Sequence, residues 1–384
     1  MERVYGRRRD KPASLTAAPA KAARMTHMLP RVLGAALIFA MTLSAQTSAP
    51  APTVARPGQW AIVVHGGAGV IERSSMTPER DKAYRAGVTH AIEAAEAVLN
   101  RNGDAIDAVE AALKVFEDDP LFNCGKGAVF TAKGTNELDA AIMDGKTMKA
   151  GAVAEVTHTK NPISLAKAVM LQSPHVFLVG AGADEFAASV GLEQVPNSYF
   201  FTERRWESFV NQMKKEGRPV PPRPAGAPPA PGAPQADLET PDAHKYGTTG
   251  IAVRDRRGNV AAGTTTGGTQ GKQFGRVGDT PVIGAGTYAS NDSCAVSATG
   301  TGEYFIRLTV ASRICSLVQY RGMPLQAAMD EVGQKQLTAI HGDGGVIGLT
   351  PDGQMAWSFN TPGMFRGKLV EGGQIQLGIY RDEP

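Results

Sequence analysis

The amino-acid sequence predicts an α+β fold in which layered β-sheets are flanked by helices. Short apolar runs come in pairs around tight turns, for example residues 138–143 and 150–156 around Asp144-Gly145. Segments with apolar residues at helical spacing alternate with these pairs. The 44 glycines among 384 residues favour many turns and close approaches of the backbone. Paired strands and amphipathic helices both bury their apolar faces when sheets and helices stack in layers.

The first block of the chain alternates strands and helices. Residues 60–65 are an apolar run typical of a buried strand, which the glycine-rich segment 66–69 ends. Thr77 caps a helix that begins at Pro78 and extends to about residue 99, and Asp104 begins a second helix. Further along this block we predict strands at 138–143, 150–156 and 175–179, and helices at about 162–171 and 182–189.

A proline-rich segment separates this block from the next. Residues 217–241 hold nine prolines and almost no large apolar side chains, so they cannot bury a core. We therefore assign an exposed, flexible linker to 217–247, between a block at 59–216 and a block at 248–384. In the second block we predict strands at 249–254, 260–265, 346–350 and 355–359, and one long helix at about 302–320.

The composition excludes several classes of protein. The sequence has 40 basic and 37 acidic residues, which give a net charge of +3. This charge is too small to attract nucleic acid or an anionic membrane surface strongly. Three cysteines cannot make a disulfide framework, and we expect Cys294 and Cys315 to be small buried residues. The seven histidines show no metal-ligand spacing, and His65 is expected to be structural.

The N-terminal segment has the pattern of a secretory signal. Residues 1–24 are basic, and residues 33–45 form an apolar run that is too short to span a bilayer and ends in small residues. We assign a signal peptide to 1–45 and a spacer to 46–58. The mature protein is then expected to begin near Trp60 and to be exported to the periplasm or the medium. An uncleaved membrane anchor is the alternative.

The junction between the linker and the second block can supply a nucleophile. Gly247 and Thr248 stand at the start of a predicted buried strand. If the chain is cut before Thr248, the new α-amine lies within hydrogen-bond reach of the threonine hydroxyl and can act as its base. The free amine has a pKa near 8, which suits this role. An ordinary strand-starting threonine after a glycine turn is the alternative.

Other polar residues of the second block can complete such a site. Thr264 and Thr266 point to the same side of their strand and can hydrogen-bond a nucleophile on its neighbour. Arg276 and Asp279 lie three residues apart in a glycine-rich loop. The guanidinium can bind an α-carboxylate, and the carboxylate can bind an α-amine. Residues 298–303 precede a helix, and their N–H groups with the Thr299 hydroxyl can form an oxyanion hole.

These residues lie within a series of motifs that resembles the plant-type L-asparaginase and isoaspartyl peptidase family of N-terminal-nucleophile hydrolases. The resemblance covers about 60–205 and 245–381. Its main stretches are HGGAG (65–69), DDPLFNCGKGAVF (118–130), ELDAAIMDG (137–145), GTTG (247–250), GNVAAGTTTGG (258–268), GRVGDTPVIGAG (275–286), TGTGE (299–303) and FNTPGM (359–364).

The resemblance implies a four-layer αββα sandwich and a precursor that cleaves itself between Gly247 and Thr248. The α and β chains would assemble as (αβ)2. Thr248 would be the nucleophile that hydrolyses the β-amide of L-asparagine or of isoaspartyl dipeptides. The other roles implied are a second active-site threonine (Thr266), an oxyanion hole (Thr299, Gly300), and substrate binding (Arg276, Asp279, Thr299, Gly300, Gly302, Asn123).

The resemblance implies no cofactor for catalysis but a structural sodium ion. The main-chain carbonyls expected around it belong to Phe116, Glu117, Asp119, Phe122, Cys124 and Lys126. Glycosylasparaginase is the nearest alternative, although Gly247 and Gly267 stand where that group usually has Asp and Asn. A nucleotide-binding protein is disfavoured because HGGAG lacks the GxGxxG spacing. The third alternative is a homologue that stays uncleaved, has no catalytic activity and acts as a binding protein.

Overall fold

The computed structural model describes residues 54–229 and 247–383. Its strands are β1 (Ala61–Gly69), β2 (Leu138–Asp144), β3 (Ala150–Val156), β4 (Phe177–Val179), β5 (Thr249–Arg254), β6 (Val260–Thr266), β7 (Thr287–Ala289), β8 (Ala295–Gly300), β9 (Gly344–Leu349), β10 (Met355–Phe359), β11 (Gly363–Val370) and β12 (Gln376–Tyr380). Its α-helices are α1 (Pro78–Asn100), α2 (Ala105–Asp118), α3 (Pro162–Gln172), α4 (Gly180–Ser189), α5 (Glu203–Lys215), α6 (Gly302–Leu308), α7 (Val310–Arg321), α8 (Leu325–Asp330) and α9 (Leu337–Ala339).

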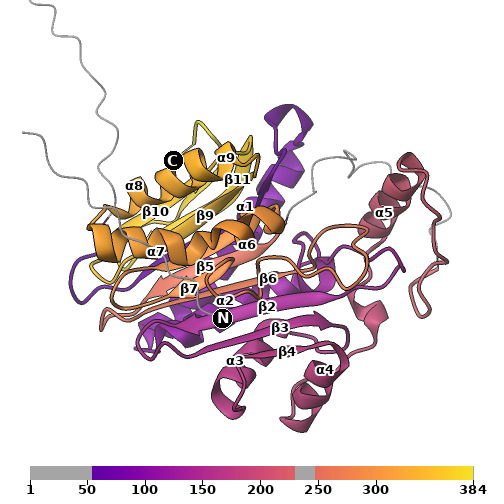
Figure 1. Ribbon diagram of the computed structural model, residues 1–384, viewed down its shortest axis with the longest axis horizontal. Helices are drawn as coiled ribbons and strands as arrows, with labels where there is room; N and C mark the ends of the chain where they lie inside the picture. The colour runs from indigo at the N-terminus through magenta and orange to yellow at the C-terminus, as the bar shows by residue number, and fades with distance from the viewer. Residues whose placement is uncertain (1–53, 230–246, 384) are drawn as a thin grey trace, which may run out of the picture. The chain divides into compact units, whose positions relative to one another are not determined.

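The described strands form two sheets (Figure 1). The larger has the order β12-β11-β1-β5-β6-β2-β3-β4, and the smaller has the order β10-β9-β8-β7. Neighbouring strands are antiparallel except for β3 and β4, which run parallel. The mixed α+β class predicted from the sequence is thereby confirmed.

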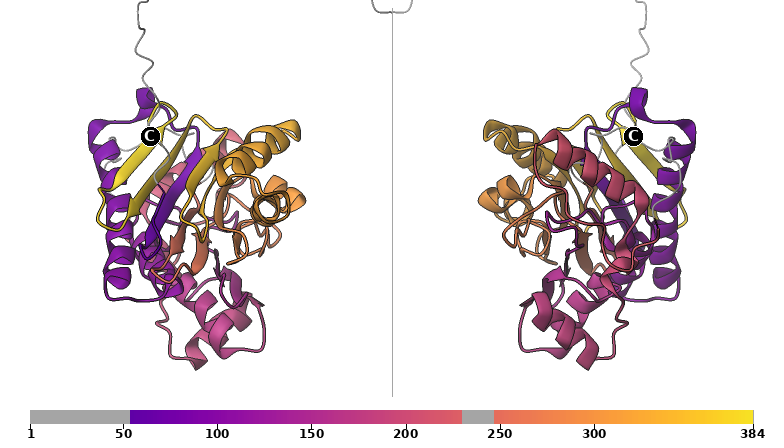
Figure 2. Two further views of the ribbon diagram at one scale, coloured as in Figure 1. Left: turned by 90° about the vertical axis from the view of Figure 1, so that its left-hand side faces the viewer. Right: turned by 90° about the vertical axis from the view of Figure 1, so that its right-hand side faces the viewer.

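The apolar side chains of β1 show how the layers form. Ile62 and Val64 belong to the cluster that α1, α2 and α3 share with one face of the larger sheet. Val63, one residue out of phase, packs instead among side chains of β5, β6, β8 and β9, between the two sheets. A third cluster joins the smaller sheet to α6, α7 and α8. Figure 2 shows the purple α1 and α2 and the orange α6 and α7 on opposite sides of the strands.

The pairing of β5 with β6 brings the start of one strand beside the end of the next. The strands are antiparallel, and Thr249 at the start of β5 is opposite Thr265 near the end of β6. Both strands are buried along their whole length. The residues just before β5 and at the end of β6 therefore lie side by side at one edge of the buried layers.

Several elements differ from the prediction. β1 continues through the glycine-rich segment, with a shift of register between His65 and Gly67 opposite β11. The long helix expected at 302–320 is two helices, because Thr309 between them has the left-handed φ of 50°. Seven further elements were not predicted from the sequence: β7, β8, β11, β12, α5, α8 and α9. Of these, α5 carries a usable signal that was overlooked, because Trp206, Phe209 and Met213 recur at helical spacing after the capping Thr202.

The ends of the predicted spacer and linker that are described pack against the fold. Ala55 is buried, and its N–H donates to the Gly353 carbonyl at 2.9 Å. Arg223 pairs with Glu203 and lies over the Phe201 ring, 4.5 Å from its centroid. The signal peptide predicted at 1–45 and residues 230–246 of the linker lie outside the described residues.

The expectation for two of the cysteines was incomplete. Cys294 and Cys315 are buried as expected, but they form a disulfide that joins the residue just before β8 to α7 across 21 residues of sequence. Cys124 is free and buried. Spacing alone gave no pairing, because only the packing of α7 against β8 brings the two thiols together.

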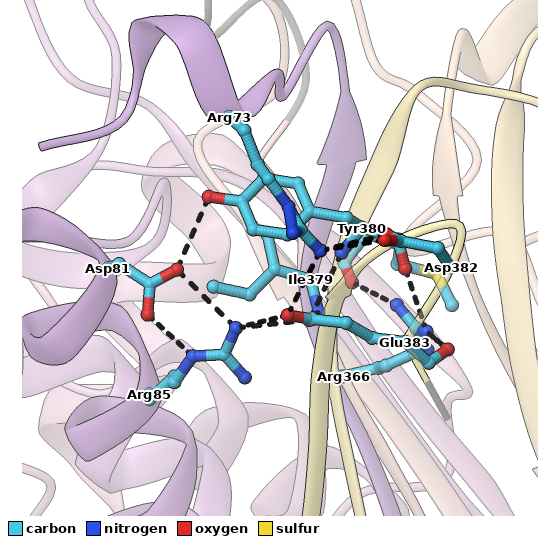
Figure 3. A network of polar contacts seen from close by, with 9 residues as sticks. Arg73, Asp81, Arg85, Arg366, Ile379, Tyr380, Asp382 and Glu383 are labelled. Atoms are coloured by element: carbon cyan, nitrogen blue, oxygen red, sulfur yellow. Dashed lines mark hydrogen bonds and ion pairs between the residues drawn. The ribbon is translucent and has the colours of Figure 1, made fainter. Parts of the chain in front are cut away.

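A network of polar contacts fixes the segment after β12 to α1 (Figure 3). Arg85 of α1 binds Asp81 at 2.6 Å and Glu383 at 2.8 Å. The Tyr380 hydroxyl donates to Asp81 at 3.2 Å, and Arg73 reaches Asp382 at 2.9 Å. These contacts link the edge of the larger sheet to the helix that covers it.

Replacing both disulfide cysteines with serine (Cys294→Ser with Cys315→Ser) is expected to lower the free energy of unfolding by about 3 kcal/mol. The bond restricts the unfolded chain over a loop of 21 residues. Urea unfolding followed by fluorescence measures the change. A reductant present during unfolding should bring the wild type to the level of the variant and leave the variant unchanged. Equal stability of the two proteins without reductant would contradict this expectation.

Candidate active site

Thr248 and Thr266 form the centre of the candidate site. The Thr248 hydroxyl donates a hydrogen bond to the Thr266 hydroxyl oxygen at 3.1 Å, and the N–H of Gly268 donates to that same oxygen at 3.0 Å. Thr248 is 8% exposed, so it is shielded but not sealed from solvent. In the intact chain its nitrogen belongs to a peptide bond and has no basicity. A base at this nitrogen exists only after the bond to Gly247 is broken.

The end of β8 lies at the same edge of the layers. β1 is antiparallel to β5 with His65 opposite Gly250, so residues after His65 extend past the start of β5. One of these, Ala68, donates its N–H to the Thr299 hydroxyl at 3.3 Å. This contact brings Thr299, and with it Gly300, to the end of the sheets where Thr248 precedes β5.

The loop that holds Arg276 and Asp279 packs against the start of α6. A Cβ on Gly302 would lie 2.8 Å from Asp279 Oδ1 and 3.1 Å from Arg276 Nη2. Arg276 binds Glu303 through Nε at 2.9 Å and Nη2 at 3.1 Å. Three residues predicted from sequence are therefore adjacent, and the contact with Glu303 is one that the sequence analysis missed.

The Asp279 carboxyl is buried and only partly satisfied. Its Oδ2 makes no hydrogen bond to any residue in 54–229 or 247–383. Burial raises the pKa of Asp279 to about 7, and the nearby Arg276 offsets part of that shift. An arriving ammonium group would supply the missing partner and favour the carboxylate form.

Asn123 connects the loop after α2 to the end of β6. Its Nδ2 donates to the Gly268 carbonyl at 2.8 Å, and its Oδ1 accepts from Val129 N at 2.9 Å. The position of a Cβ on Gly247 would be 2.8 Å from the Asn123 Cβ. Asn123 thus lies beside the predicted cleavage site, and its main contacts hold the surrounding backbone.

Thr264 does not join Thr248 as the alternation of the strand suggested. Its hydroxyl lies 2.7 Å from Ser297 Oγ and accepts from Thr287 Oγ1 at 2.7 Å. Ser297 in turn is 2.9 Å from His65 Nε2. Burial lowers the pKa of His65 to about 3, and a hydrogen bond with the Thr248 main chain offsets only part of that shift. His65 is therefore a neutral structural residue between the sheets.

The loop predicted to hold sodium has carbonyl oxygens close to glycines. A Cβ on Gly125 would be 2.0 Å from the Glu117 oxygen, and one on Gly127 would be 2.0 Å from the Phe122 oxygen. The Lys126 ammonium lies 5.4 Å from the centroid of the Tyr199 ring. Within the described ranges, no three side chains of His, Cys, Asp or Glu are placed to hold a metal ion.

Comparison with known proteins identifies the family. Residues 58–379 match the family described as asparaginase. The chain is 43% identical to the isoaspartyl peptidase of Escherichia coli K12, over 85% of this chain and 98% of that protein. It is 40% identical to a probable isoaspartyl peptidase/L-asparaginase 2 of Arabidopsis thaliana, over 84% and 99%, and 36% identical to the isoaspartyl peptidase/L-asparaginase of Mus musculus, over 83% and 90%.

The chain therefore belongs to the asparaginase family of N-terminal-nucleophile hydrolases, as its motifs predicted. It is a hydrolase. The glycosylasparaginase alternative is not favoured, because the relatives that cover most of the chain are named isoaspartyl peptidases and L-asparaginases.

The predicted export is wrong, because the relatives are largely cytosolic enzymes. The basic and apolar pattern on which that prediction depended lies in residues 1–45, outside the described residues. In the part of the chain that the structure describes, no helix combines the length and the apolar character needed to cross a bilayer.

Replacing His65 with glutamine (His65→Gln) is expected to reduce the acid sensitivity of folding. Between pH 6.5 and about 3 the unfolded chain binds a proton on His65 that the folded chain does not. The free energy of unfolding of the wild type therefore falls as the pH falls through this range. His65→Gln removes up to about 1.4 kcal/mol per pH unit of that slope.

Urea unfolding at pH 4 to 7.5 measures this slope. Comparing slopes separates the effect from any constant loss caused by the substitution itself. His175→Gln makes the same change at an exposed position and serves as the control. Identical slopes for the wild type and His65→Gln would rule out a neutral, buried His65.

Proposed function

We propose that this protein hydrolyses β-aspartyl amide bonds, in isoaspartyl dipeptides and in L-asparagine. The observation that carries the proposal is the hydroxyl pair of Thr248 and Thr266 at 3.1 Å, directly after Gly247. The names of the relatives, isoaspartyl peptidase and L-asparaginase, support this substrate class.

The precursor would first cleave itself between Gly247 and Thr248. The Thr248 oxygen attacks the carbonyl carbon of Gly247, and the acyl group moves from nitrogen to oxygen. Water then hydrolyses the ester, which frees the Thr248 amine and the carboxylate of Gly247. Gly247 suits this step because it lies against Asn123 with no room for a Cβ. The products are an α chain that ends at Gly247 and a β chain of residues 248–384.

Amide hydrolysis would follow the same chemistry on the substrate. The freed amine accepts the Thr248 hydroxyl proton as its oxygen attacks the β-carbonyl carbon. Thr299 and Gly300 stabilise the oxyanion, and Thr266 orients the nucleophile through its hydrogen bond. The leaving nitrogen takes the proton and departs as ammonia or as the amino group of an amino acid. Water hydrolyses the β-aspartyl ester and releases aspartate.

Arg276 and Asp279 would recognise the α-groups that both substrates share. The guanidinium pairs with the α-carboxylate, and the buried Asp279 carboxyl, which lacks a partner on Oδ2, pairs with the α-ammonium. Gly302 gives both side chains room to approach. A substrate that lacks the α-ammonium leaves the buried Asp279 Oδ2 without a partner, and one that lacks the α-carboxylate loses its pairing with Arg276, so either should react poorly.

The mature enzyme would assemble as (αβ)2. Exposed apolar side chains gather around α3 and β4: Met148, Leu171, Val176, Phe177 and Val179. Some of them line a cavity of about 510 Å³ together with Met170 and Ile283. An apolar surface of this kind is typical of a contact between subunits.

A sodium ion would stabilise the loop 116–126. The Glu117 and Phe122 carbonyl oxygens approach Gly125 and Gly127 so closely that a Cβ at either glycine would collide with them. Oxygen donors from main-chain carbonyls suit a hard cation. The remaining carbonyls proposed for it are those of Phe116, Asp119, Cys124 and Lys126. The ion would hold this loop, and so Asn123, in place beside Thr248.

Purified wild-type protein is expected to consist of two fragments, of which one begins at Thr248 and has 137 residues. Thr248→Ala removes the attacking oxygen and should give a single chain with no activity, whereas Thr248→Ser keeps a hydroxyl and should still cleave. Intact mass and N-terminal sequencing identify the fragments. A wild type that stays uncleaved after long incubation, yet hydrolyses β-aspartyl dipeptides, would refute the amine as base.

Removal of sodium is expected to lower the thermal midpoint and the activity, because loop 116–126 would lose the charge that its carbonyls surround. The protein is dialysed into tetramethylammonium buffer, and sodium chloride is then added back. Choline chloride at the same ionic strength is the control. If both salts restore the midpoint equally, the loop has no specific sodium site.

A further inference from the structure

Arg276 uses one edge of its guanidinium within the protein and leaves another available. Nε and Nη2 both bind the Glu303 carboxylate, at 2.9 and 3.1 Å. Nη1 makes no hydrogen bond to any residue that the structure describes. A guanidinium binds a carboxylate through two neighbouring nitrogens in its plane. With the Nε–Nη2 edge taken, the Nη1–Nη2 edge is the one that can receive a second carboxylate.

Glycines on both sides allow this arrangement. A Cβ on Gly278 would lie 2.8 Å from Nη1 and 3.2 Å from Nη2, and one on Gly302 would lie 3.1 Å from Nη2. The guanidinium is therefore enclosed by backbone that makes no hydrogen bond to it. Without a partner on its Nε–Nη2 edge, no hydrogen bond from the described residues would fix the rotation of its plane.

Glu303 is suited to supply that partner. The Arg276 side chain is 18% exposed, whereas that of Glu303 is 55% exposed, so the carboxylate reaches the guanidinium from the solvent side. The ion pair with Arg276 lowers the pKa of Glu303, which keeps it charged near neutral pH. An exposed ion pair contributes little to the free energy of unfolding. The contact with Glu303 therefore matters mainly because it orients the Arg276 guanidinium.

We propose that Glu303 is a positioning residue for substrate recognition: it holds the Nε–Nη2 edge of Arg276 so that the Nη1–Nη2 edge binds the substrate's α-carboxylate. This inference rests on the β-aspartyl hydrolase function proposed above. Glu303 does not contact the reacting bond, so its loss should affect substrate binding and leave the rate of the bound complex nearly unchanged.

The test is the binding of L-aspartate, measured by isothermal titration calorimetry, together with the hydrolysis of a β-aspartyl dipeptide. Glu303→Gln is expected to raise the Kd for L-aspartate and the KM for the dipeptide about tenfold, the loss expected for one charge-assisted interaction. The kcat should change less than about twofold. Glu303→Asp keeps the charge and should recover part of the binding. Glu331→Gln, at another surface ion pair (2.9 Å to Lys335), is the control.

Two further measurements separate positioning from a general structural effect. In an Arg276→Lys background, Glu303→Gln should cost no more than about twofold, because Glu303 acts through the guanidinium. Wild-type preference for L-aspartate over its α-carboxamide should shrink about tenfold in Glu303→Gln. The amount of self-cleaved protein and the thermal midpoint show that each variant folds.

Several outcomes would overturn the proposal. One is an unchanged Kd in Glu303→Gln, and another is a full loss that persists in the Arg276→Lys background. Tighter binding in Glu303→Gln would mean that Glu303 competes with the substrate for Arg276. A wild type that binds L-aspartate but hydrolyses no β-aspartyl bond would refute the proposed function while leaving the binding test valid. A wild type that does not bind L-aspartate would overturn the positioning role.

Discussion

The antiparallel pairing of β5 with β6, buried on both faces, is the constraint on which the candidate site depends. It places the start of one strand beside the end of the other, so Thr248 and Thr266 meet without any long side chain to bridge them. Strands packed between helices on one face and a second sheet on the other have little freedom to shift. A hydroxyl nucleophile that depends on a short contact needs this rigidity.

Burial on both faces also explains the polar residues between the sheets. His65, Ser297, Thr264 and Thr287 come from four different strands and hydrogen-bond one another in an otherwise apolar interior. A buried polar group without a partner is costly, so such a network matches only one alignment of the two sheets. The same alignment brings Thr299 of β8 to the end of the layers where Thr248 lies.

The proposed substrate recognition has a different physical basis from the proposed nucleophile. Arg276, Asp279 and Glu303 lie on a loop and at the start of a short helix, where glycines permit close approach. Their arrangement is set by charge: the guanidinium binds one carboxylate of the protein, and Asp279 keeps an oxygen without a partner. The candidate site is thus rigid where bonds would break and electrostatically selective where the α-groups would bind.

The sequence by itself determined the fold class, most helices and strands of the first block, and the family. Capping and turn signals predicted α1, β2 and β3 nearly to their ends, and apolar residues at helical spacing predicted α2, because these signals act locally along the chain. The motif series identified the asparaginase family and hence the candidate roles of Thr248, Arg276 and Asp279. The basic and apolar pattern in residues 1–45 also predicted export, which the relatives contradict. A leader pattern carries no information about the family of the protein that follows it.

Only the tertiary structure decided which residues meet. The Cys294–Cys315 disulfide, the turn of Thr264 toward Ser297, and the hold of Glu303 on Arg276 join residues that are distant in sequence. The break at Thr309 likewise had no helical stop signal, since a left-handed threonine is imposed by packing and not by propensity. Contacts of this kind depend on how the sheets and helices stack, and the pattern of apolar residues along the chain does not specify that stacking.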